Sequence, residues 1–355
     1  MPLVAKSNLP TFDYLRREGA RILTSEEAQR QDIRELHIGL LNMMPDAALQ
    51  ATERQFFRLV GESNQIAQFI MHTFTLNELA RSAQAQDYID TYYDPFAQLK
   101  ADGLDALIIT GANVTQPDLA AEPFWEPLIE VIDWAAEHVT SILCSCLATH
   151  AVLQFRHGQH RRRLPAKRWG VYPHRVVNAR HPLVADVNSL FDVPHSRFNE
   201  IGRDQFEAAG LQVLVESDVA GVHLAVSDDL FRFIYFQGHP EYDTISLLKE
   251  YKREVKLYAQ GLRADYPPFP ENYFTDKSQA ILEEYQDRLA AALARGEPAP
   301  DFPEDHVRPA LHNTWHDTAE AVIDNWIGKV YEVTHHDRKL PFKDGIDPAD
   351  PLGLR

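Results

Sequence analysis

The stretch Thr140-Ser-Ile-Leu-Cys-Ser-Cys-Leu-Ala-Thr-His-Ala-Val-Leu-Gln154 decides how the rest of the chain is interpreted. It begins as a short apolar run, passes through two cysteines and continues as a small-residue, apolar segment that is typical of a helix. A buried strand that turns sharply into a helix presents its turn residue at the carboxyl edge of a sheet, where open α/β sheets bind ligands. The same geometry forms a nucleophile elbow. We therefore take this stretch as the candidate active centre, with Cys146 as the nucleophile.

The two cysteines of this stretch differ in their expected surroundings. Cys144 lies inside the apolar run, so burial should raise the pKa of its thiol and make it inert. Cys146 falls at the turn, where the partial positive charge of a helix N-terminus favours the thiolate. A disulfide between residues so close in the chain would need strained geometry. Because no disulfide framework is available, the sequence fits a reducing, cytoplasmic compartment.

Strand and helix patterns alternate on the N-terminal side of this stretch. Near-continuous apolar runs, typical of strands covered on both faces, occupy residues 36–44, 66–75 and 104–112. Apolar residues at helical spacing occupy residues 47–60 and 122–138, whereas residues 79–99 are ambiguous. This alternation predicts an α/β protein with a doubly wound parallel sheet.

In the C-terminal half, a group of strand patterns is followed by a group of helical patterns. Strand patterns cover residues 169–177 and 211–217 and a hairpin of residues 222–226 with 231–236, and helical patterns cover residues 244–262, 278–294 and 315–331. We expect three parts: an N-terminal extension at residues 1–35 with helices at 11–17 and 25–34, a catalytic domain at 36–262, and a C-terminal extension at 263–355 packed on the same domain. The tail from Thr334 is expected to be loosely held.

Charge and composition exclude several classes of function. The 355-residue chain has a formal net charge of −17, whereas sequence-independent nucleic-acid binding needs a basic surface. No uninterrupted apolar stretch approaches the length that spans a bilayer, and the N-terminus lacks the pattern of a secretory signal. We therefore expect neither a nucleic-acid nor a membrane partner.

A second group of residues could complete the chemistry of Cys146. A cysteine nucleophile needs a base, and the base needs an orienting group. The segment Gly238-His-Pro-Glu241 follows an apolar strand pattern and supplies both, as His239 and Glu241. If that strand is parallel to the strand before Cys146, both ends lie on one edge of the sheet. The alternative is a buried inert cysteine and a loop histidine that hydrogen-bonds to the backbone.

Basic and polar residues gather in two further segments. Residues 164–175 and 194–198 are expected to place cationic and hydroxyl side chains in loops beside strands, where they could bind carboxylates or phosphates. The run His160-Arg-Arg-Arg163 could contact the phosphates of a large anionic substrate, or it could be a solvated basic loop. His312 and His316 have the spacing of a helical metal pair, but no third ligand follows in register, so we predict no metal site.

The ordered combination of these motifs resembles one family over most of the chain. It is similar to the homoserine O-acyltransferases of the homoserine O-succinyltransferase family, which have a class I glutamine amidotransferase-like fold. The matching stretches are Leu40-Leu-Asn-Met-Met-Pro45, Ile108-Ile-Thr-Gly-Ala112, Val139-Thr-Ser-Ile-Leu-Cys-Ser-Cys146, Trp169-Gly-Val-Tyr-Pro-His-Arg-Val176, Pro194-His-Ser-Arg197, Gly238-His-Pro-Glu-Tyr-Asp243, Glu271-Asn-Tyr-Phe274 and Asn325-Trp326. The resemblance implies a flavodoxin-like three-layer α/β/α sandwich with N- and C-terminal extensions.

The resemblance also implies a reaction. Cys146 would carry the acyl group as a thioester after attacking succinyl-CoA or acetyl-CoA, with His239 as general base and Glu241 orienting it. The acceptor would be the hydroxyl of L-homoserine, in methionine biosynthesis, with no cofactor beyond these substrates. Further residues match the family's substrate-contacting and oxyanion positions, the latter through backbone N–H groups: Lys167, Ser196, Arg253, Gly111 and Leu147. A homodimer is what the family suggests.

The sequence departs from the family at several positions and leaves alternatives open. The family usually has Trp after the nucleophile, where this chain has Leu147. Thr115 falls where Glu goes with acetyl donors and Gly with succinyl donors; because Thr does not repel a second carboxylate, we favour succinyl-CoA. The alternatives are acetyl-CoA as donor, serine as acceptor, an amidotransferase-like cysteine hydrolase, and a non-catalytic binding protein with a degenerate site.

Overall fold

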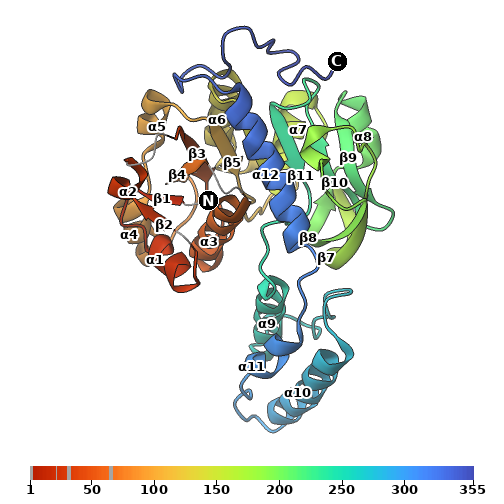
Figure 1. Cartoon of the computed structure of the whole chain (residues 1–355). Coiled ribbons are helices and arrows are strands. Elements are labelled where there is room, and N and C mark those ends of the chain that lie inside the picture. The colour runs from red at the N-terminus through yellow and green to blue at the C-terminus, as the bar shows by residue number, and fades with distance from the viewer. Residues whose placement is uncertain (1–2, 21, 30–32, 64–66) are drawn as a thin grey trace.

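Figure 1 shows the computed structural model of the chain, which describes residues 3–20, 22–29, 33–63 and 67–355. These residues form an 11-stranded sheet with the strand order β2-β1-β4-β3-β5-β6-β11-β10-β9-β7-β8. The strands are Leu3–Ala5 (β1), Ile22–Thr24 (β2), Glu35–Leu41 (β3), Gln68–Phe74 (β4), Ala106–Ile109 (β5), Ser141–Ser145 (β6), Arg162–Val176 (β7), Leu190–Glu200 (β8), Gln212–Ser217 (β9), Gly221–Val226 (β10) and Phe233–Phe236 (β11).

Helices connect and cover these strands. The α-helices are Pro10–Arg17 (α1), Ser25–Gln29 (α2), Asp46–Ser63 (α3), Ala83–Tyr92 (α4), Phe96–Asp102 (α5), Trp125–His138 (α6), Leu147–His157 (α7), Arg203–Ala208 (α8), Ser246–Ala259 (α9), Asp276–Ala294 (α10), Glu304–Val307 (α11) and His316–Val333 (α12). Short 3-10 helices cover Leu119–Ala121 (η1), Pro182–Val184 (η2) and Arg308–Ala310 (η3).

The centre of the sheet is parallel, as the alternating pattern predicts. Strands β4, β3, β5, β6 and β11 run in one direction, and β10, β9, β7 and β8 continue the sheet in antiparallel fashion. The register pairs Phe233 with Ile142 and Phe236 with Ser145. The residues that follow β6 and β11 therefore leave the sheet at the same edge, which satisfies the condition set for Cys146 and His239.

Two apolar layers cover the sheet, one on each face. One cluster joins α1, α3 and α12 to the sheet, and a second joins α5, α6, α7 and α8 to its opposite face. The largest side chain in the first layer is Trp326 of α12, which is 1% exposed and donates from Nε1 to Ser141 Oγ at 2.8 Å. The expected three-layer α/β/α sandwich is confirmed, because both faces of β3, β5 and β6 are buried against helices.

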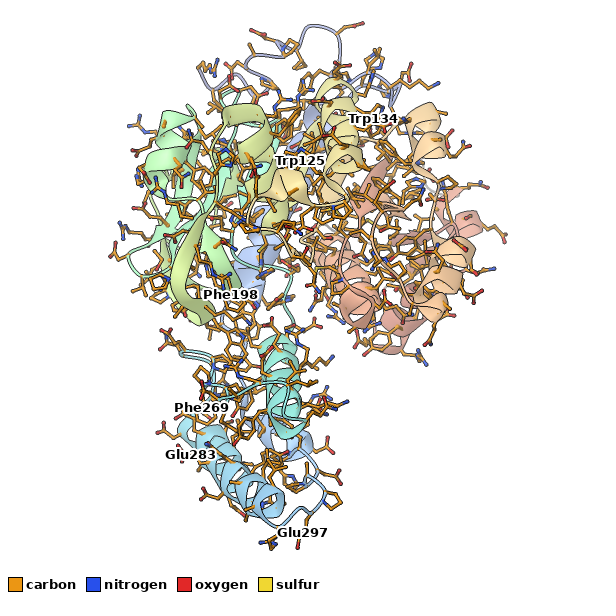
Figure 2. All side chains as sticks on the ribbon, turned by 180° about the vertical axis from the view of Figure 1, so that it is seen from behind. Trp125, Trp134, Phe198, Phe269, Glu283 and Glu297 are labelled. Atoms are coloured by element: carbon orange, nitrogen blue, oxygen red, sulfur yellow. The ribbon has the colours of Figure 1, made fainter. Side chains whose placement is uncertain are left out.

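Helices α9, α10 and α11 form a unit that projects from one end of the sandwich (Figure 1). A separate apolar cluster holds it together, with Tyr251 of α9 contacting Phe269, Phe274 and Phe302. Figure 2 shows Phe269 and the surface residues Glu283 and Glu297 on this unit. The chain then returns to the sandwich as α12, so the unit is an insertion between β11 and the last helix.

The structure corrects several expectations. Residues 164–168 and 194–198, expected in loops, lie in the long antiparallel pair β7 and β8, and residues 162–163 also lie in β7. The ambiguous segment 79–99 contains α4 and the start of α5. Thr334 at the start of the tail is buried and donates to Asp105 Oδ1 at 2.9 Å, so the tail is not loose there. Parts of the expected helix 25–34 and strand 66–75, at residues 30–32 and 66, lie outside the described residues.

Candidate active site

Cys146 occupies a strained elbow between β6 and α7. It is the N-cap residue of α7 with φ of 52° and ψ of −104°, a backbone conformation that is rare for a residue with a side chain. Its N–H donates to the carbonyl oxygen of Phe236 at 2.8 Å. Thr149 Oγ1 lies 2.9 Å from that same oxygen and 2.9 Å from the Cys144 carbonyl oxygen. These bonds hold the strained turn against the end of β11.

The two thiols differ as the sequence predicts. Cys144 is fully buried, and this burial raises the pKa of its thiol above its usual range. Cys146 is half-buried at the helix N-terminus, and both cysteines are free thiols. Only Cys146 therefore combines access with a position that stabilises a thiolate.

His239 and Glu241 meet beside Cys146. His239 Nδ1 lies 2.8 Å from Glu241 Oε1, and both residues are buried. Burial alone would lower the pKa of His239. The charges of Glu241 and Cys146, together with hydrogen bonds to both, outweigh burial and raise the pKa of His239 well above its usual value. The structure thus brings the three predicted residues together as a thiol, an imidazole and an orienting carboxylate.

A compact backbone positions His239. Its N–H donates to the carbonyl oxygen of Pro194 in β8 at 2.9 Å. A Cβ atom on Gly238 would lie 2.5 Å from Val193 Cγ1, 2.8 Å from His223 Nδ1 and 3.0 Å from His195 Cε1. Because real Cβ atoms essentially never show the two shorter distances, glycine lets the segment after β11 approach β8 this closely.

Gly111 lies close to Cys146 and to the backbone nitrogen of Leu147. A Cβ atom on Gly111 would lie 3.9 Å from Cys146 Cβ, 4.0 Å from the Leu147 nitrogen and 3.8 Å from Met44 Sδ. Leu147 is the first residue of α7, so its N–H has no acceptor within the helix. The two predicted oxyanion residues therefore lie next to each other and to the nucleophile.

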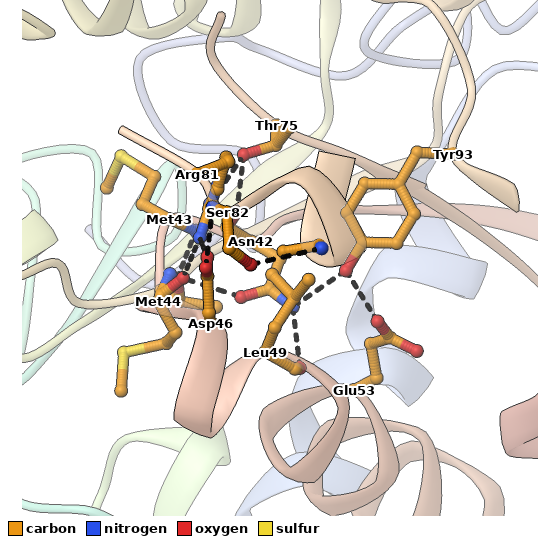
Figure 3. A network of polar contacts seen from close by, with 12 residues as sticks. Asn42, Met43, Met44, Asp46, Leu49, Glu53, Thr75, Arg81, Ser82 and Tyr93 are labelled. Carbon is orange, nitrogen blue, oxygen red and sulfur yellow. Dashed lines mark hydrogen bonds and ion pairs between the residues drawn. The ribbon is translucent and has the colours of Figure 1, made fainter. Parts of the chain in front are cut away.

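A polar network fixes the turn that carries Met44 (Figure 3). Asn42 Nδ2 donates to the Leu49 carbonyl oxygen at 2.9 Å and to Tyr93 Oη at 3.0 Å. Arg81 Nη1 donates to the Met44 carbonyl oxygen at 2.5 Å, with a side chain only 3% exposed. This network anchors the end of β3 beside Gly111.

Lys167 and Ser196 converge on a residue that sequence reasoning missed. Glu250 of α9 accepts from Lys167 Nζ at 3.0 Å, from Ser196 Oγ at 2.6 Å and from Tyr242 Oη at 2.8 Å. Burial alone would raise the pKa of Glu250, but the charge of Lys167 and these hydrogen bonds lower it below its usual value. Glu250 lies on an ordinary amphipathic helix, so only the fold reveals its partners.

Arg253 and Thr115 lie in different surroundings. Arg253 is on the same helix as Glu250, but its side chain is 56% exposed and lies 3.6 Å from Glu254, so the structure does not bring it to Lys167 and Ser196. Thr115 contacts a buried carboxylate: its N–H and that of Gln116 donate to Glu122 Oε1, and its hydroxyl lies 3.3 Å from Glu122 Oε2. The sequence offered no sign of this contact.

The described part of the chain contains neither a metal site nor a helix that could span a membrane. No group of three or more His, Cys, Asp or Glu side chains there is placed to hold a metal ion. No helix among the same residues has the length and apolar character needed to cross a membrane.

Comparison with known proteins agrees with the resemblance. A family model described as homoserine O-succinyltransferase matches residues 2–336. The chain is 68% identical over 354 residues to a homoserine O-succinyltransferase of Allochromatium vinosum, covering 100% of this chain and 99% of the relative. It is 67% identical over 355 residues to one of Nitrosococcus oceani, with the same coverage. A glutamine amidotransferase structure from Thermotoga maritima aligns with 84% of this chain and 99% of its own at 10% identity and a TM-score of 0.46. The full-length match and the high identities show that this chain belongs to the homoserine O-succinyltransferase family.

Proposed function

We propose that this protein transfers the succinyl group of succinyl-CoA to the hydroxyl of L-homoserine through a thioester on Cys146. The observation that carries this proposal is the meeting of Cys146, His239 and Glu241 at a strained elbow, in a chain of this family. The product would enter methionine biosynthesis. The reaction needs no cofactor beyond its two substrates.

The first half-reaction acylates the enzyme. His239 takes the proton of the Cys146 thiol, and the thiolate attacks the thioester carbonyl of succinyl-CoA. The negative charge that develops on the carbonyl oxygen is stabilised by the N–H groups of Gly111 and Leu147. The bond to CoA then breaks, and the proton held by His239 passes to the departing CoA thiolate. Glu241 stabilises the imidazolium while it carries this proton.

The second half-reaction repeats the chemistry with a different nucleophile. His239, again neutral, takes the proton of the homoserine hydroxyl, whose oxygen attacks the acyl-Cys146 carbonyl. The bond to sulfur breaks, and Cys146 recovers its proton from His239. CoA therefore leaves before homoserine is acylated, which is a ping-pong scheme.

The cluster around Glu250 is suited to an amino acid. An amino acid presents an ammonium and a carboxylate, and Glu250 and Lys167 offer the opposite charges 3.0 Å apart beside the hydroxyl of Ser196. We propose that Glu250 binds the ammonium group of homoserine and Lys167 its carboxylate. The exposed Arg253 side chain would have to turn from its position beside Glu254 to reach that carboxylate. Serine, one methylene shorter, would bind the same groups but hold its hydroxyl further from Cys146.

Intact-protein mass spectrometry tests the reaction directly. Mixing with succinyl-CoA alone should add one succinyl group, and L-homoserine should remove it. Cys146→Ala should abolish the adduct, whereas Cys144→Ala, a matched change of the buried neighbouring thiol, should retain it. An acetyl adduct in place of a succinyl adduct would reverse the donor. A free, reactive Cys146 that gives no adduct with either donor would contradict the proposed function.

The assembly and location follow from the same proposal. We propose a homodimer, as the family suggests, to be tested by light scattering on the purified chain; a monomer mass would contradict it. We propose a cytoplasmic location, because a free catalytic thiol persists in a reducing compartment and both CoA thioesters and free thiols are stable there. Fractionation of cells that express the chain tests the location.

A further inference from the structure

Arg161 is bound to the loop that borders the nucleophile. It lies between the end of α7 and the start of β7. Its Nη2 donates to the carbonyl oxygen of Gln116 at 2.8 Å and lies 3.3 Å from that of Pro117. The same loop begins with Gly111, where an added Cβ atom would lie 3.9 Å from Cys146 Cβ, and continues through Thr115. Arg161 thus bonds to this loop directly after Thr115, the expected donor-specificity position.

One N–H group of the Arg161 guanidinium, at Nε, has no hydrogen-bond partner among the described residues. This Nε atom is buried. Buried N–H groups are nearly always paired in folded proteins, so the Nε–H of Arg161 needs an acceptor, which a water molecule or a ligand can supply. Arginine is the side chain best matched to a carboxylate, because its planar fork can donate two parallel hydrogen bonds.

The charges around Arg161 leave the guanidinium available. Burial lowers the pKa of Arg161, as does the charge of Arg163, whereas Glu122, Asp118 and Cys146 raise it. Glu122 is already bonded to the N–H groups of Thr115 and Gln116, and Asp118 accepts from Gln154 at 2.6 Å. Both acids are therefore engaged elsewhere, and no ion pair joins Arg161 to a carboxylate among the described residues.

We infer that Arg161 binds the free carboxylate of the succinyl group when the other end of that group is attached to Cys146, and so selects succinyl over uncharged acyl donors. This inference rests on the proposed function, because it requires a succinyl thioester at Cys146. An acyl chain that leaves the sulfur along the loop 111–117 meets the guanidinium. An acetyl group has no atom for Arg161 to bind.

Thr115 acts on this selection through Glu122. Its backbone N–H and its hydroxyl both contact the Glu122 carboxylate, which keeps that negative charge turned toward the loop. Thr115 is thus a positioning residue, whereas Arg161 is the residue that contacts the substrate.

Three acyl donors that differ at the far end of the acyl chain test the inference. Succinyl-CoA carries a carboxylate there, its neutral isostere succinamoyl-CoA carries an amide, and acetyl-CoA has no such group. For the unmodified enzyme we expect kcat/KM for succinyl-CoA to exceed that for succinamoyl-CoA by about 10- to 100-fold, the range typical of one charge-assisted pair. Arg161→Gln should bring this ratio to about one with little change for acetyl-CoA, and Arg161→Lys should restore part of it. The matched control is Arg162→Gln, since Arg162 is exposed and bonded to Asp204 at 2.6 Å, and the ratio should stay unchanged.

Each outcome decides between the proposals. An unmodified enzyme that forms no succinyl adduct contradicts the proposed function itself. An unmodified enzyme that uses succinyl-CoA and succinamoyl-CoA equally overturns the role of Arg161, whether or not any variant folds. If Arg161→Gln lowers the rate with all three donors by the same factor, Arg161 supports the loop and does not select the donor.

Discussion

The ring of Tyr242 lies flat against the imidazole of His239, with 4.3 Å between ring centroids and 18° between ring planes. The hydroxyl of the same tyrosine donates to Glu250 at 2.8 Å. Tyr242 therefore joins the proposed general base to the cluster proposed to bind the acceptor. His239 also bonds to Glu241. The hydrogen bond to Glu241 restrains rotation of the imidazole within its plane, and stacking on Tyr242 restrains tilting of the ring.

Glu241→Gln should shift the pH dependence of the second half-reaction. The charge of Glu241 raises the pKa of His239, so its removal lowers that pKa. Homoserine attack needs neutral His239, and the acidic limb of the rate profile should therefore move to lower pH. The maximal rate should fall by about 10²- to 10⁴-fold because the imidazolium loses its partner. Single-turnover rates of acyl-enzyme discharge across pH measure both effects, and an acidic limb that stays in place would contradict this role for Glu241.

Glu250→Gln should separate the two half-reactions. The acyl-enzyme should still form with succinyl-CoA, whereas KM for homoserine should rise about 10- to 100-fold, because a charged hydrogen bond to the ammonium is lost. The control is Glu254→Gln on the same helix, whose carboxylate pairs with Arg263 at 2.8 Å. Equal losses in acylation and discharge would show that Glu250 only holds the fold together.

Gly238→Ala should destabilise the protein, because its added methyl group would collide with Val193 and two buried histidines. Overpacking of this kind costs about 1–3 kcal/mol in the free energy of unfolding. Gly328→Ala in α12 is the matched control: no described atom lies within 4 Å of its added methyl group, and it should gain about 0.5–1 kcal/mol from helix propensity. Urea denaturation measures both, and equal midpoints for the two variants would refute the steric reason.

Trp326→Ala should cost about 3–5 kcal/mol, the range for removing a large buried aromatic side chain. It also removes the hydrogen bond to Ser141 at the start of β6. Trp134 on the opposite face, labelled in Figure 2, is only partly buried, so Trp134→Ala should cost less. Thermal unfolding measures the loss of stability in both variants. A loss for Trp134→Ala as large as that for Trp326→Ala would contradict the prediction.

The parallel core could be predicted from the sequence because its strands are buried on both faces. The apolar runs of β3, β5 and β6 and the break at Cys146 carry that information locally. Parts of β7 and β8 are predicted as loops because these strands are rich in charged, exposed residues and lack the continuous apolar runs of the central strands. The fold class and the family are confirmed by the structure and the comparisons.

Some residues of the candidate site could likewise be predicted from local sequence, and others could not. Cys146, His239 and Glu241 lie in short motifs whose residue types match the chemistry of a nucleophile, a base and an orienting acid, and the structure brings them together. Glu250, Glu122 and Arg161 have no such motif, since each depends on residues from a different part of the chain. The exposed Arg253, which the resemblance selects, shows that a matching position does not by itself place a side chain in contact with the others.

The return of the chain as α12 sets an order of events during synthesis. This helix covers β6, the strand that leads into the elbow, and it is made after all the residues of the candidate site. Until residues 316–333 have left the ribosome, the face of the sheet that also packs against α1 and α3 lacks the part of its apolar cover that α12 provides. A nascent chain therefore contains Cys146, His239 and Glu241 before α12 is present to complete the packing around β6. We expect a product truncated before α12 to carry these residues without the complete packing of the site.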